Sequence, residues 1–278
     1  MTNKRASLVE VRKFYGRLMA AASGSSDPRL ERIFGFVARE AFLTPGPWQL
    51  MVNGRYVETP SADPVYIYSN SPVALDSSRG VNCGEPYLHA AWLGAVAPQP
   101  GEDIVHIGAG AGYYTALLAM LALPGGRVHA FEIDETLACK ASRNLQHFSG
   151  VSVTWGDATS RSLPPADLIY VCASVVAPPL AWLDALRPGG RVIFPWVPAE
   201  GVCVALMLTR AKAGFAVRPF MSCGFVPCAG AADRAGCERA PSVQEAWSVR
   251  SVWARAERRP DRSAVAVCRE VWFSSAPP

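Results

Sequence analysis

Residues 104–113 read IVHIGAGAGY, and this stretch decides the fold class of the chain. An apolar, strand-like run leads directly into a glycine-rich turn, and residues 113–123 continue as an apolar, helix-like run. In a doubly wound α/β sheet such a turn lies at the carboxyl end of a strand, where glycine lets the backbone approach a ligand closely. The pattern predicts a ligand-binding strand–turn–helix unit. A tight turn without a ligand is the plainer alternative.

The spacing of Gly108, Gly110 and Gly112 narrows the class of ligand. A dinucleotide-binding turn has a small residue at the sixth position of its pattern, where this chain has Tyr113. No Gly-Lys-Ser/Thr follows, which excludes a phosphate-binding P-loop. A GxGxG turn without the third small residue resembles the turn of S-adenosylmethionine-dependent methyltransferases.

Acidic residues follow at the ends of the next two expected strands. Glu132 comes twenty positions after Gly112, where a carboxylate can accept hydrogen bonds from both ribose hydroxyls. Asp157 follows the third strand, where a carboxylate can accept from an adenine amino group, while Asp134 is expected to cap a helix. Either acid alone is equally compatible with a helix cap or a solvated loop. The expected cofactor-binding residues are Gly108, Ala109, Gly110, Gly112, Glu132, Ile133, Asp157 and Ala158.

From residue 101 onward, short apolar runs alternate with helix-like runs, which is typical of βαβ units and a parallel sheet. Strands are expected at residues 103–108, 127–133, 151–155, 167–173 and 191–195, and helices at 113–123, 135–148 and 180–186. Residues 202–209 and 215–226 have no helix between them, so they should form an antiparallel pair. The expected fold class is α/β: a doubly wound, mostly parallel, Rossmann-like methyltransferase sheet with an antiparallel edge.

The flanks complete a three-part organisation. Residues 1–80 should form an N-terminal helical cap and loop region, in which Asp27 and Pro28 begin the second helix as N-cap and first helical residue. Residues 81–228 should form the cofactor-binding core, and residues 229–278 a C-terminal extension packed on it. Within that extension residues 263–272 alternate like one strand, and the Arg-rich stretch before them reads as a solvated face or mobile linker.

Composition excludes several classes of protein. The chain has 278 residues, 50% hydrophobic and 18% charged, as globular proteins do. The apolar stretch at residues 168–183 contains Ser174, Pro178 and Pro179 and falls short of the roughly 18 clean apolar residues of a membrane span, so no membrane protein is expected. No secretory signal is expected from the first residues. The net charge of the chain is +4, but residues 41–228 carry 11 Lys and Arg against 13 Asp and Glu, so the positive charge lies in the flanks. Because the central region has no basic surface, no nucleic-acid or membrane partner is expected. Eight cysteines without a CxxC pair indicate reduced thiols, no metal site and a cytoplasmic location.

Several segments together resemble the protein-L-isoaspartate O-methyltransferases. They are residues 37–43 (VAREAFL), 80–90, 106–115 (HIGAGAGYYT), 131–134 (FEID), 186–191 (LRPGGR) and 224–227 (GFVP), the last resembling the family's final core strand. The resemblance covers roughly residues 30–228. It implies S-adenosyl-L-methionine as cofactor, an N-terminal cap that contributes to the acceptor site, and methyl transfer to a carboxylate of a peptide or protein, isoaspartyl or related aspartyl.

One segment departs from that family. Its active-site segment usually reads Gly-x-Thr-Ile-Ser-x-Pro, whereas residues 80–86 read GVNCGEP. The hydroxyl thought to lie between cofactor and acceptor is therefore missing at Gly84, and Asn82 stands at the Thr position. The candidate catalytic residues are Asn82, Cys83, Gly84 and His89, although a packing thiol and a structural imidazole are the plainer interpretations of Cys83 and His89.

The mechanism expected for a carboxylate acceptor needs little acid–base chemistry. Transfer of a sulfonium methyl group requires donor and acceptor to be held in line, and a carboxylate is already ionised at neutral pH. Two alternatives remain open from the sequence. One is a tailoring methyltransferase for a biosynthetic peptide or small-molecule natural product, and the other is a catalytically silent methyltransferase fold that serves as a binding subunit.

Overall fold

Five parallel strands form the centre of the molecule, a computed structural model that describes residues 6–278. They are β5 (Asp103–Ile107), β6 (Arg127–Glu132), β7 (Val151–Trp155), β8 (Ala166–Val171) and β9 (Leu186–Trp196). Strand β5 pairs with β6 and β8, and β7 and β9 lie outside them. The glycine-rich turn follows the middle strand of this set, at the point where the strand order reverses, which is where open α/β sheets bind ligands.

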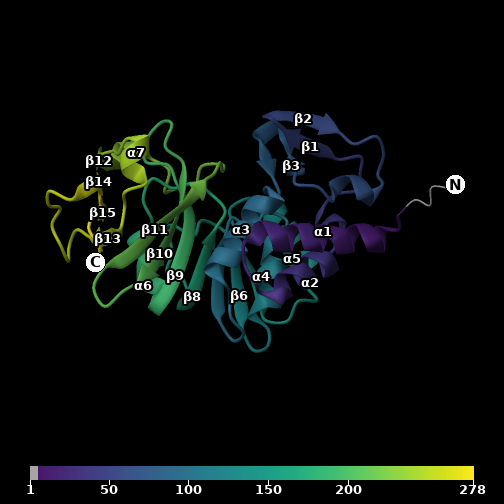
Figure 1. Cartoon of the computed structure of the whole chain (residues 1–278), viewed down its shortest axis with the longest axis horizontal. Helices are drawn as coiled ribbons and strands as arrows, with labels where there is room; N and C mark the ends of the chain where they lie inside the picture. The colour runs from purple at the N-terminus through teal and green to yellow at the C-terminus, as the bar shows by residue number, and fades with distance from the viewer. Residues whose placement is uncertain (1–5) are drawn as a thin grey trace.

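Antiparallel strands continue the same sheet beyond β9 (Figure 1). They are β10 (Val204–Arg210), β11 (Phe215–Ser222), β12 (Cys237–Arg239), β13 (Ser251–Ala254), β14 (Ala264–Cys268) and β15 (Val271–Ser274). The expected pair at residues 202–209 and 215–226 is confirmed as β10 and β11. The sheet has 11 strands in the order β12-β14-β15-β13-β11-β10-β9-β8-β5-β6-β7, so the antiparallel part is larger than an edge.

Two expectations about the last strands were wrong. Residues 263–272 form a hairpin rather than one strand, because the exposed pair Arg269 and Glu270 turns the chain between β14 and β15. Residues 224–227 lie after β11 as a loop, in which Pro227 makes only an isolated bridge to Ser174. Proline has no backbone N–H to donate to a ladder, so this segment is a poor interior strand.

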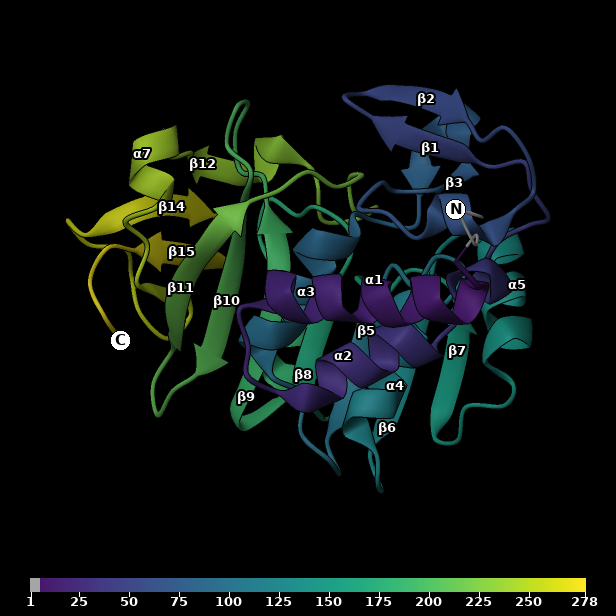
Figure 2. The same cartoon turned by 45° about the vertical axis from the view of Figure 1, so that its right-hand side comes forward.

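One face of the sheet is covered by helices. Alternate residues Ile104, Leu168 and Tyr170 point into this core, together with α3 (Pro86–Val96) and α4 (Tyr113–Ala122). Helices α1 (Leu8–Ser23) and α2 (Pro28–Phe36) form a second layer outside α3 and α4 (Figure 2). The side chain of Asp27 caps α2 and Pro28 is its first residue, as expected from the sequence.

The other face is covered mainly by the C-terminal extension. The intervening residues Val105, Ile107 and Ile169 join a second core with the short helix α6 (Leu180–Ala185) and strands β13 to β15. Trp196 at the end of β9 stacks on Phe273 of β15 with ring centroids 4.4 Å apart. The extension therefore both lengthens the sheet and packs against it. The Arg-rich stretch is packed in part, because residues 251–254 form β13 and Arg258 lies over the ring of Trp253 at 4.6 Å. Arg259 and Arg262 are exposed, as on the solvated face that the sequence offered as one interpretation.

Helix α5 (Glu135–Leu145) packs against β6 and β7, and the other remaining elements lie around the carboxyl ends of the parallel strands and in the extension. They are β1 (Gln49–Val52), β2 (Arg55–Glu58), β3 (Ala74–Asp76), β4 (Val81–Asn82), α7 (Val243–Ala246) and the short 3-10 helices η1 (Arg39–Phe42), η2 (Pro64–Ile67), η3 (Ser77–Arg79) and η4 (Arg234–Gly236). Asp134 caps α5 by accepting from the Leu137 N–H at 2.9 Å, as expected. Within residues 6–278 no helix is both long and apolar enough to cross a bilayer.

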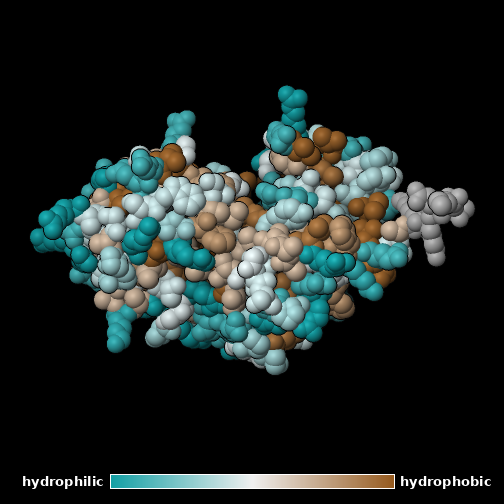
Figure 3. Space-filling view, viewed as in Figure 1, coloured by the Kyte–Doolittle hydropathy of each residue, from teal (hydrophilic) through white to brown (hydrophobic). Residues whose placement is uncertain are grey.

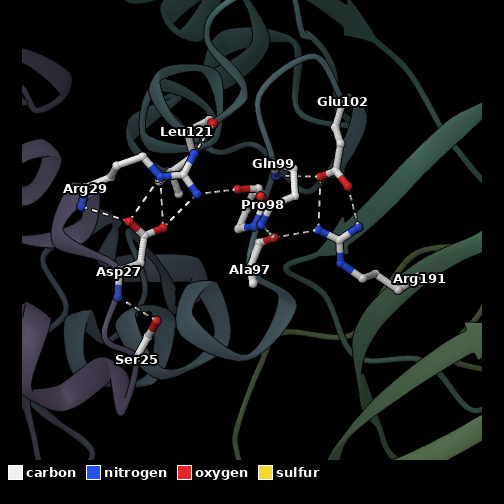
Figure 4. Close-up of polar contacts among 9 residues, drawn as sticks. All are labelled: Ser25, Asp27, Arg29, Ala97, Pro98, Gln99, Glu102, Leu121 and Arg191. Carbon is white, nitrogen blue, oxygen red and sulfur yellow. Dashed lines mark hydrogen bonds and ion pairs between the residues drawn. The ribbon is translucent and has the colours of Figure 1, made fainter.

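Two arginines bind the connection between α3 and β5, one from the N-terminal helices and one from the sheet (Figure 4). Arg29 of α2 binds Asp27 and donates to the carbonyls of Pro98 at 2.8 Å and Leu121 at 3.0 Å. From the other side, Arg191 of β9 pairs with Glu102 at 2.8 Å. Because the last carbonyls of a helix have no partner within the helix, the Arg29 cation at the Leu121 carbonyl stabilises the end of α4. The helical cap is thereby fixed relative to the strands that carry the site.

Candidate active site

A cavity of about 990 Å³ lies between the glycine-rich turn and the N-terminal segment. Residues 108–111 line one end of it, which we call the cofactor end after the role expected from the sequence. Residues 80–85 and 87–89 line the other end, which we call the acceptor end for the same reason, and residues 221–226 after β11 close a side. The space-filling view shows the surface hollowed between the lobe that carries β1 and β2 and the lobe of the C-terminal strands (Figure 3). A cavity of this volume accommodates a cofactor together with part of an acceptor.

The glycine-rich turn forms the cofactor end. Gly110 and Gly112 have positive φ angles of 55° and 95°, which glycine adopts without steric cost. A Cβ atom at Gly112 would lie 2.8 Å from a methyl carbon of Leu145, and one at Gly110 would lie 3.2 Å from Leu75. Side chains at these two positions would fill the space between the glycine-rich turn and the leucine side chains next to it. The turn is thus a cradle of bare backbone, which fits the cofactor expected from the sequence.

Glu132 holds this turn in place. Its carboxylate accepts from the Gly110 N–H at 2.7 Å and from the Asp134 N–H at 3.0 Å, and the residue is 6% exposed. Burial raises the pKa of Glu132, and the backbone N–H groups oppose that rise. A carboxylate offers about four lone-pair sites, so both oxygens retain capacity for ribose hydroxyls. Among the described residues, Glu132 lies behind the residues that line the cavity.

Four more of the expected cofactor residues lie outside the cavity lining that the described residues form: Gly112, Ile133, Asp157 and Ala158. Ile133 is half exposed beside Trp155, whose ring N–H donates to the Ile133 carbonyl at 3.1 Å. The Asp157 carboxylate accepts from the N–H and hydroxyl of Thr159, both at 2.8 Å. Ala158 is buried and its carbonyl accepts from a tryptophan. The roles of Asp157 and its neighbours toward adenine stay predictions.

The four candidate catalytic residues all line the acceptor end of the cavity. Asn82 accepts from the Gly84 N–H at 2.9 Å, which shapes the loop. The Cys83 sulfur accepts from the Val73 N–H at 3.2 Å and from the Arg39 guanidinium at 3.3 Å. The side chains of Asn82 and Cys83 therefore make contacts within the wall. Their catalytic roles stay predictions.

His89 is the buried imidazole of this wall. It is 1% exposed, stacks on Tyr114 with ring centroids 3.6 Å apart, and places Nδ1 2.9 Å from the Tyr170 hydroxyl. Burial, then the nearby His106 and the Arg39 charge, hold the pKa of His89 well below its usual value. The imidazole is therefore neutral at pH 7. His106 is also buried, and burial lowers its pKa to about 3.

Arg39 gives the acceptor end its charge, and reasoning from the sequence did not single it out. It is 2% exposed, and its guanidinium donates to the carbonyls of Ile67, Ser69 and Ser71. It also lies 5.7 Å from the ring centroid of Tyr15. Among residues 6–278 no carboxylate pairs with it. The only signal in the sequence was its place in the segment VAREAFL.

The hydroxyls of Tyr113 and Tyr114 extend the polar part of this wall. Both rings line the cavity, and both hydroxyls are buried without a hydrogen-bond partner among the described residues. Unpaired buried polar groups are rare in proteins because each costs free energy.

No group of three or more metal-binding side chains comes together within residues 6–278.

Comparisons with known proteins agree with this geometry. Residues 53–233 match the family model described as Protein-L-isoaspartate(D-aspartate) O-methyltransferase (PCMT). A protein-L-isoaspartate O-methyltransferase of Methylorubrum populi is 30% identical over 210 residues, which cover 74% of this chain and 89% of that protein. The enzyme of the same name from Aeropyrum pernix is 39% identical over 134 residues, covering 46% of this chain and only 50% of that protein.

Solved structures agree with the fold. A structure named protein-L-isoaspartate O-methyltransferase superposes with a TM-score of 0.67 at 22% identity, covering 79% of this chain and 66% of that one. A putative protein-L-isoaspartate O-methyltransferase from Plasmodium falciparum, in complex with S-adenosyl-L-homocysteine, has a TM-score of 0.63 at 19% identity. That match covers 78% of this chain and 97% of the other. At these identities the structures support the α/β methyltransferase fold.

Proposed function

Because the chain belongs to the protein-L-isoaspartate(D-aspartate) O-methyltransferase family and is an S-adenosylmethionine-dependent methyltransferase, we propose that it methylates a free carboxylate of a peptide or protein. The isoaspartyl residue is the first candidate acceptor. The observation that carries the proposal is Arg39, a buried cation in the cavity wall that has no carboxylate partner among the described residues. Carbonyls and the Cys83 sulfur accept hydrogen bonds from its guanidinium, but no negative charge neutralises it, so this position favours an anionic acceptor.

The chain's contribution to the reaction is mainly positioning. S-adenosylmethionine, when bound, supplies an electrophilic methyl group on its sulfonium. Gly108 to Ala111 would hold it against the strand ends, and Glu132 would accept from its ribose hydroxyls. The acceptor end lies in the same cavity, where Arg39 attracts a carboxylate and the buried aromatic rings exclude water. Holding the two reactants together in this way accounts for catalysis without a general base.

An ionised acceptor also agrees with the state of the nearby titratable groups. A free carboxylate has a pKa near 3.9 and carries its charge at neutral pH, so no proton has to be removed before transfer. The buried imidazole at the acceptor end is neutral at pH 7, since burial lowers its pKa. The cytoplasmic location expected from the cysteine usage stays a prediction.

The test is methyl transfer to matched peptides. The full chain is incubated with methyl-labelled S-adenosylmethionine and either an isoaspartyl peptide or the same peptide with normal aspartate. We expect base-labile label on the isoaspartyl peptide, because methyl esters hydrolyse readily in mild alkali, and much less on its aspartyl isomer. Cofactor binding without transfer to either peptide would contradict the proposal. Label that survives alkali would indicate a different acceptor atom, as in a tailoring enzyme.

A further inference from the structure

His89 and Gly84 fit each other in the wall of the cavity. A Cβ atom at Gly84 would lie 2.3 Å from His89 Nε2, far inside van der Waals contact. Gly84 also has a φ angle of 77°, in the left-handed region that favours glycine. The edge of the imidazole therefore occupies the space in which a side chain at position 84 would begin. A serine cannot be added at position 84 while His89 keeps this position.

The imidazole is held on every side except at Nε2. Tyr114 stacks on one face with the ring planes 17° apart, and Phe225 contacts the ring edge-to-face at 5.8 Å. Nδ1 pairs with the Tyr170 hydroxyl at 2.9 Å. Among the described residues no side chain or carbonyl pairs with Nε2. The ring atom that faces Gly84 at the cavity wall is thus the one that is free to bind a ligand.

The Tyr170 contact fixes which nitrogen carries the proton. Tyr170 is completely buried, and among residues 6–278 its hydroxyl has only His89 Nδ1 as a partner. If the hydroxyl donates to Nδ1, its proton is satisfied and the imidazole proton resides on Nε2. If Nδ1 carried the proton instead, the hydroxyl proton would be buried without an acceptor, which is the costlier arrangement. The neutral ring therefore presents an N–H donor at Nε2.

We propose that the His89 Nε2–H group binds a carboxylate oxygen of the acceptor and takes the place of the hydroxyl that is missing at Gly84. This inference rests on the proposed function and specifies its acceptor end. An N–H donor suits an ionised carboxylate, and Arg39 in the same wall favours the same charge. In this tautomer Nε2 has no lone pair, so His89 cannot deprotonate an alcohol or amine acceptor. The residue thereby favours acceptors that arrive already ionised.

The kinetic test compares two variants of His89. His89→Phe keeps a flat ring for Tyr114 but removes the donor, and His89→Gln offers an amide N–H near the position of Nε2. We expect His89→Phe to lower kcat/KM for the isoaspartyl peptide about 10- to 100-fold, mainly through KM, as for loss of a hydrogen bond to a charged group. His89→Gln should recover most of that loss. Both variants should bind S-adenosylhomocysteine within about threefold of the parent, measured by calorimetry.

Two kinetic results would overturn the proposal. The first is an unchanged kcat/KM in His89→Phe. The second is an equal loss of kcat/KM in both variants together with weakened S-adenosylhomocysteine binding, because that result would indicate a purely structural role for the ring.

A second measurement is independent of turnover. The ¹⁵N chemical shifts of the ring should show a protonated Nε2 and an unprotonated Nδ1 in the parent chain bound to S-adenosylhomocysteine. A protonated Nδ1 would overturn the inference even in an active enzyme, because Nε2 would then be an acceptor or a base. If the parent methylates no carboxylate peptide, the proposed function fails, and the tautomer still shows whether the wall presents a donor.

Discussion

The two ends of the cavity differ in what they keep of the family pattern. The cofactor end has the glycine-rich turn with Glu132 bound behind it, as the resemblance implies. The acceptor end lacks the Thr and Ser of the family's segment and has Asn82 and Gly84 there, next to the His89 imidazole. Arg39, which also lines this end, belongs to the segment VAREAFL that resembles the family. Mostly separate elements form the two ends, since the turn follows β5 and the acceptor wall comes from α3 and the segments before it, with Tyr113 and Tyr114 of α4 as the shared part. Cofactor binding and acceptor choice should therefore be separable by mutation.

The largest expected effect is at Gly84. Gly84→Ser places a side chain 2.3 Å from His89 Nε2 and forces the imidazole or the loop to move. Because a displacement of about 1 Å at a reacting centre can cost about 100-fold, we expect at least that loss in kcat/KM for the isoaspartyl peptide. Affinity for S-adenosylhomocysteine should stay within about threefold, since the cofactor end is untouched. Steady-state kinetics and calorimetry measure the two quantities.

Gly80→Ser is the matched control for that variant. Gly80 has a φ angle of 70° and belongs to the same segment, but a Cβ atom there meets nothing within 4 Å. A serine at position 80 would therefore have the same backbone strain of about 1 kcal/mol as one at position 84, but no steric conflict with a neighbouring side chain. Equal loss of activity in both variants would contradict the account of the acceptor wall.

The next effect is a loss of stability in acid that originates at two buried imidazoles, His89 in the acceptor wall and His106 on β5. Burial lowers the pKa of His106 to about 3 and that of His89 well below its usual value, whereas both titrate near 6.5 in the unfolded chain. The unfolded state then binds more protons below pH 6.5, so stability is present above that pH and falls as pH falls. Together they should lower the unfolding free energy by about 2.5 kcal/mol from pH 7 to pH 5.5.

Urea unfolding at the two pH values measures this loss. His106→Gln should remove about half of it, because one buried imidazole remains. The same loss in the parent and in His106→Gln would show that other groups cause the acid sensitivity.

A smaller effect is expected at the cofactor end. The Glu132 carboxylate accepts from two backbone N–H groups, whereas a glutamine has one carbonyl oxygen and would turn its NH₂ toward one of these donors. Glu132→Gln should weaken S-adenosylhomocysteine binding about 10- to 100-fold by calorimetry. The KM for the acceptor peptide at saturating cofactor should change little. Glu135→Gln, an exposed acid one turn away, is the control, and comparable weakening there would point to general electrostatics instead.

The smallest effect is expected in the C-terminal extension, which lies outside both ends of the cavity. Arg258 lies over the rings of Trp253 and Trp272, at 4.6 and 5.6 Å. Arg258→Ala should lower the unfolding free energy by about 0.5–1 kcal/mol, the usual size of an exposed cation–π contact. Methyl transfer should not change, and the exposed Arg259→Ala should alter neither quantity. A loss of activity in Arg258→Ala without loss of stability would give the extension a role in function.

The arrangement of the glycine-rich turn and Glu132 could be predicted from the sequence because its determinants are local. A strand, three glycines and Glu132 at the end of the next strand follow one another along the chain, and the carboxyl ends of neighbouring parallel strands meet at one edge. The cap of α5 at Asp134 could be predicted for the same reason, since a capping side chain binds an N–H three residues away.

The acceptor end could not be predicted in the same way, because its contacts join distant segments. The missing side chain at Gly84 and the imidazole five residues later were visible separately, but their fit depends on where Tyr114 and Tyr170 hold the ring. The burial of Arg39 depends on a loop some thirty residues later in the chain. The hairpin of β14 and β15 was missed because alternation continues through the turn, so periodicity alone did not show where the strand ends.

The most direct test of the central claim is the site of methylation on a peptide that offers competing acceptors. A peptide carrying one isoaspartyl residue, one free serine hydroxyl and one free lysine amine is incubated with the full chain and S-adenosylmethionine, and tandem mass spectrometry locates the methyl group. The account predicts a methyl ester on the isoaspartyl carboxylate only, lost after mild alkali. Methyl on the hydroxyl or the amine, with the carboxylate unmodified, would contradict it.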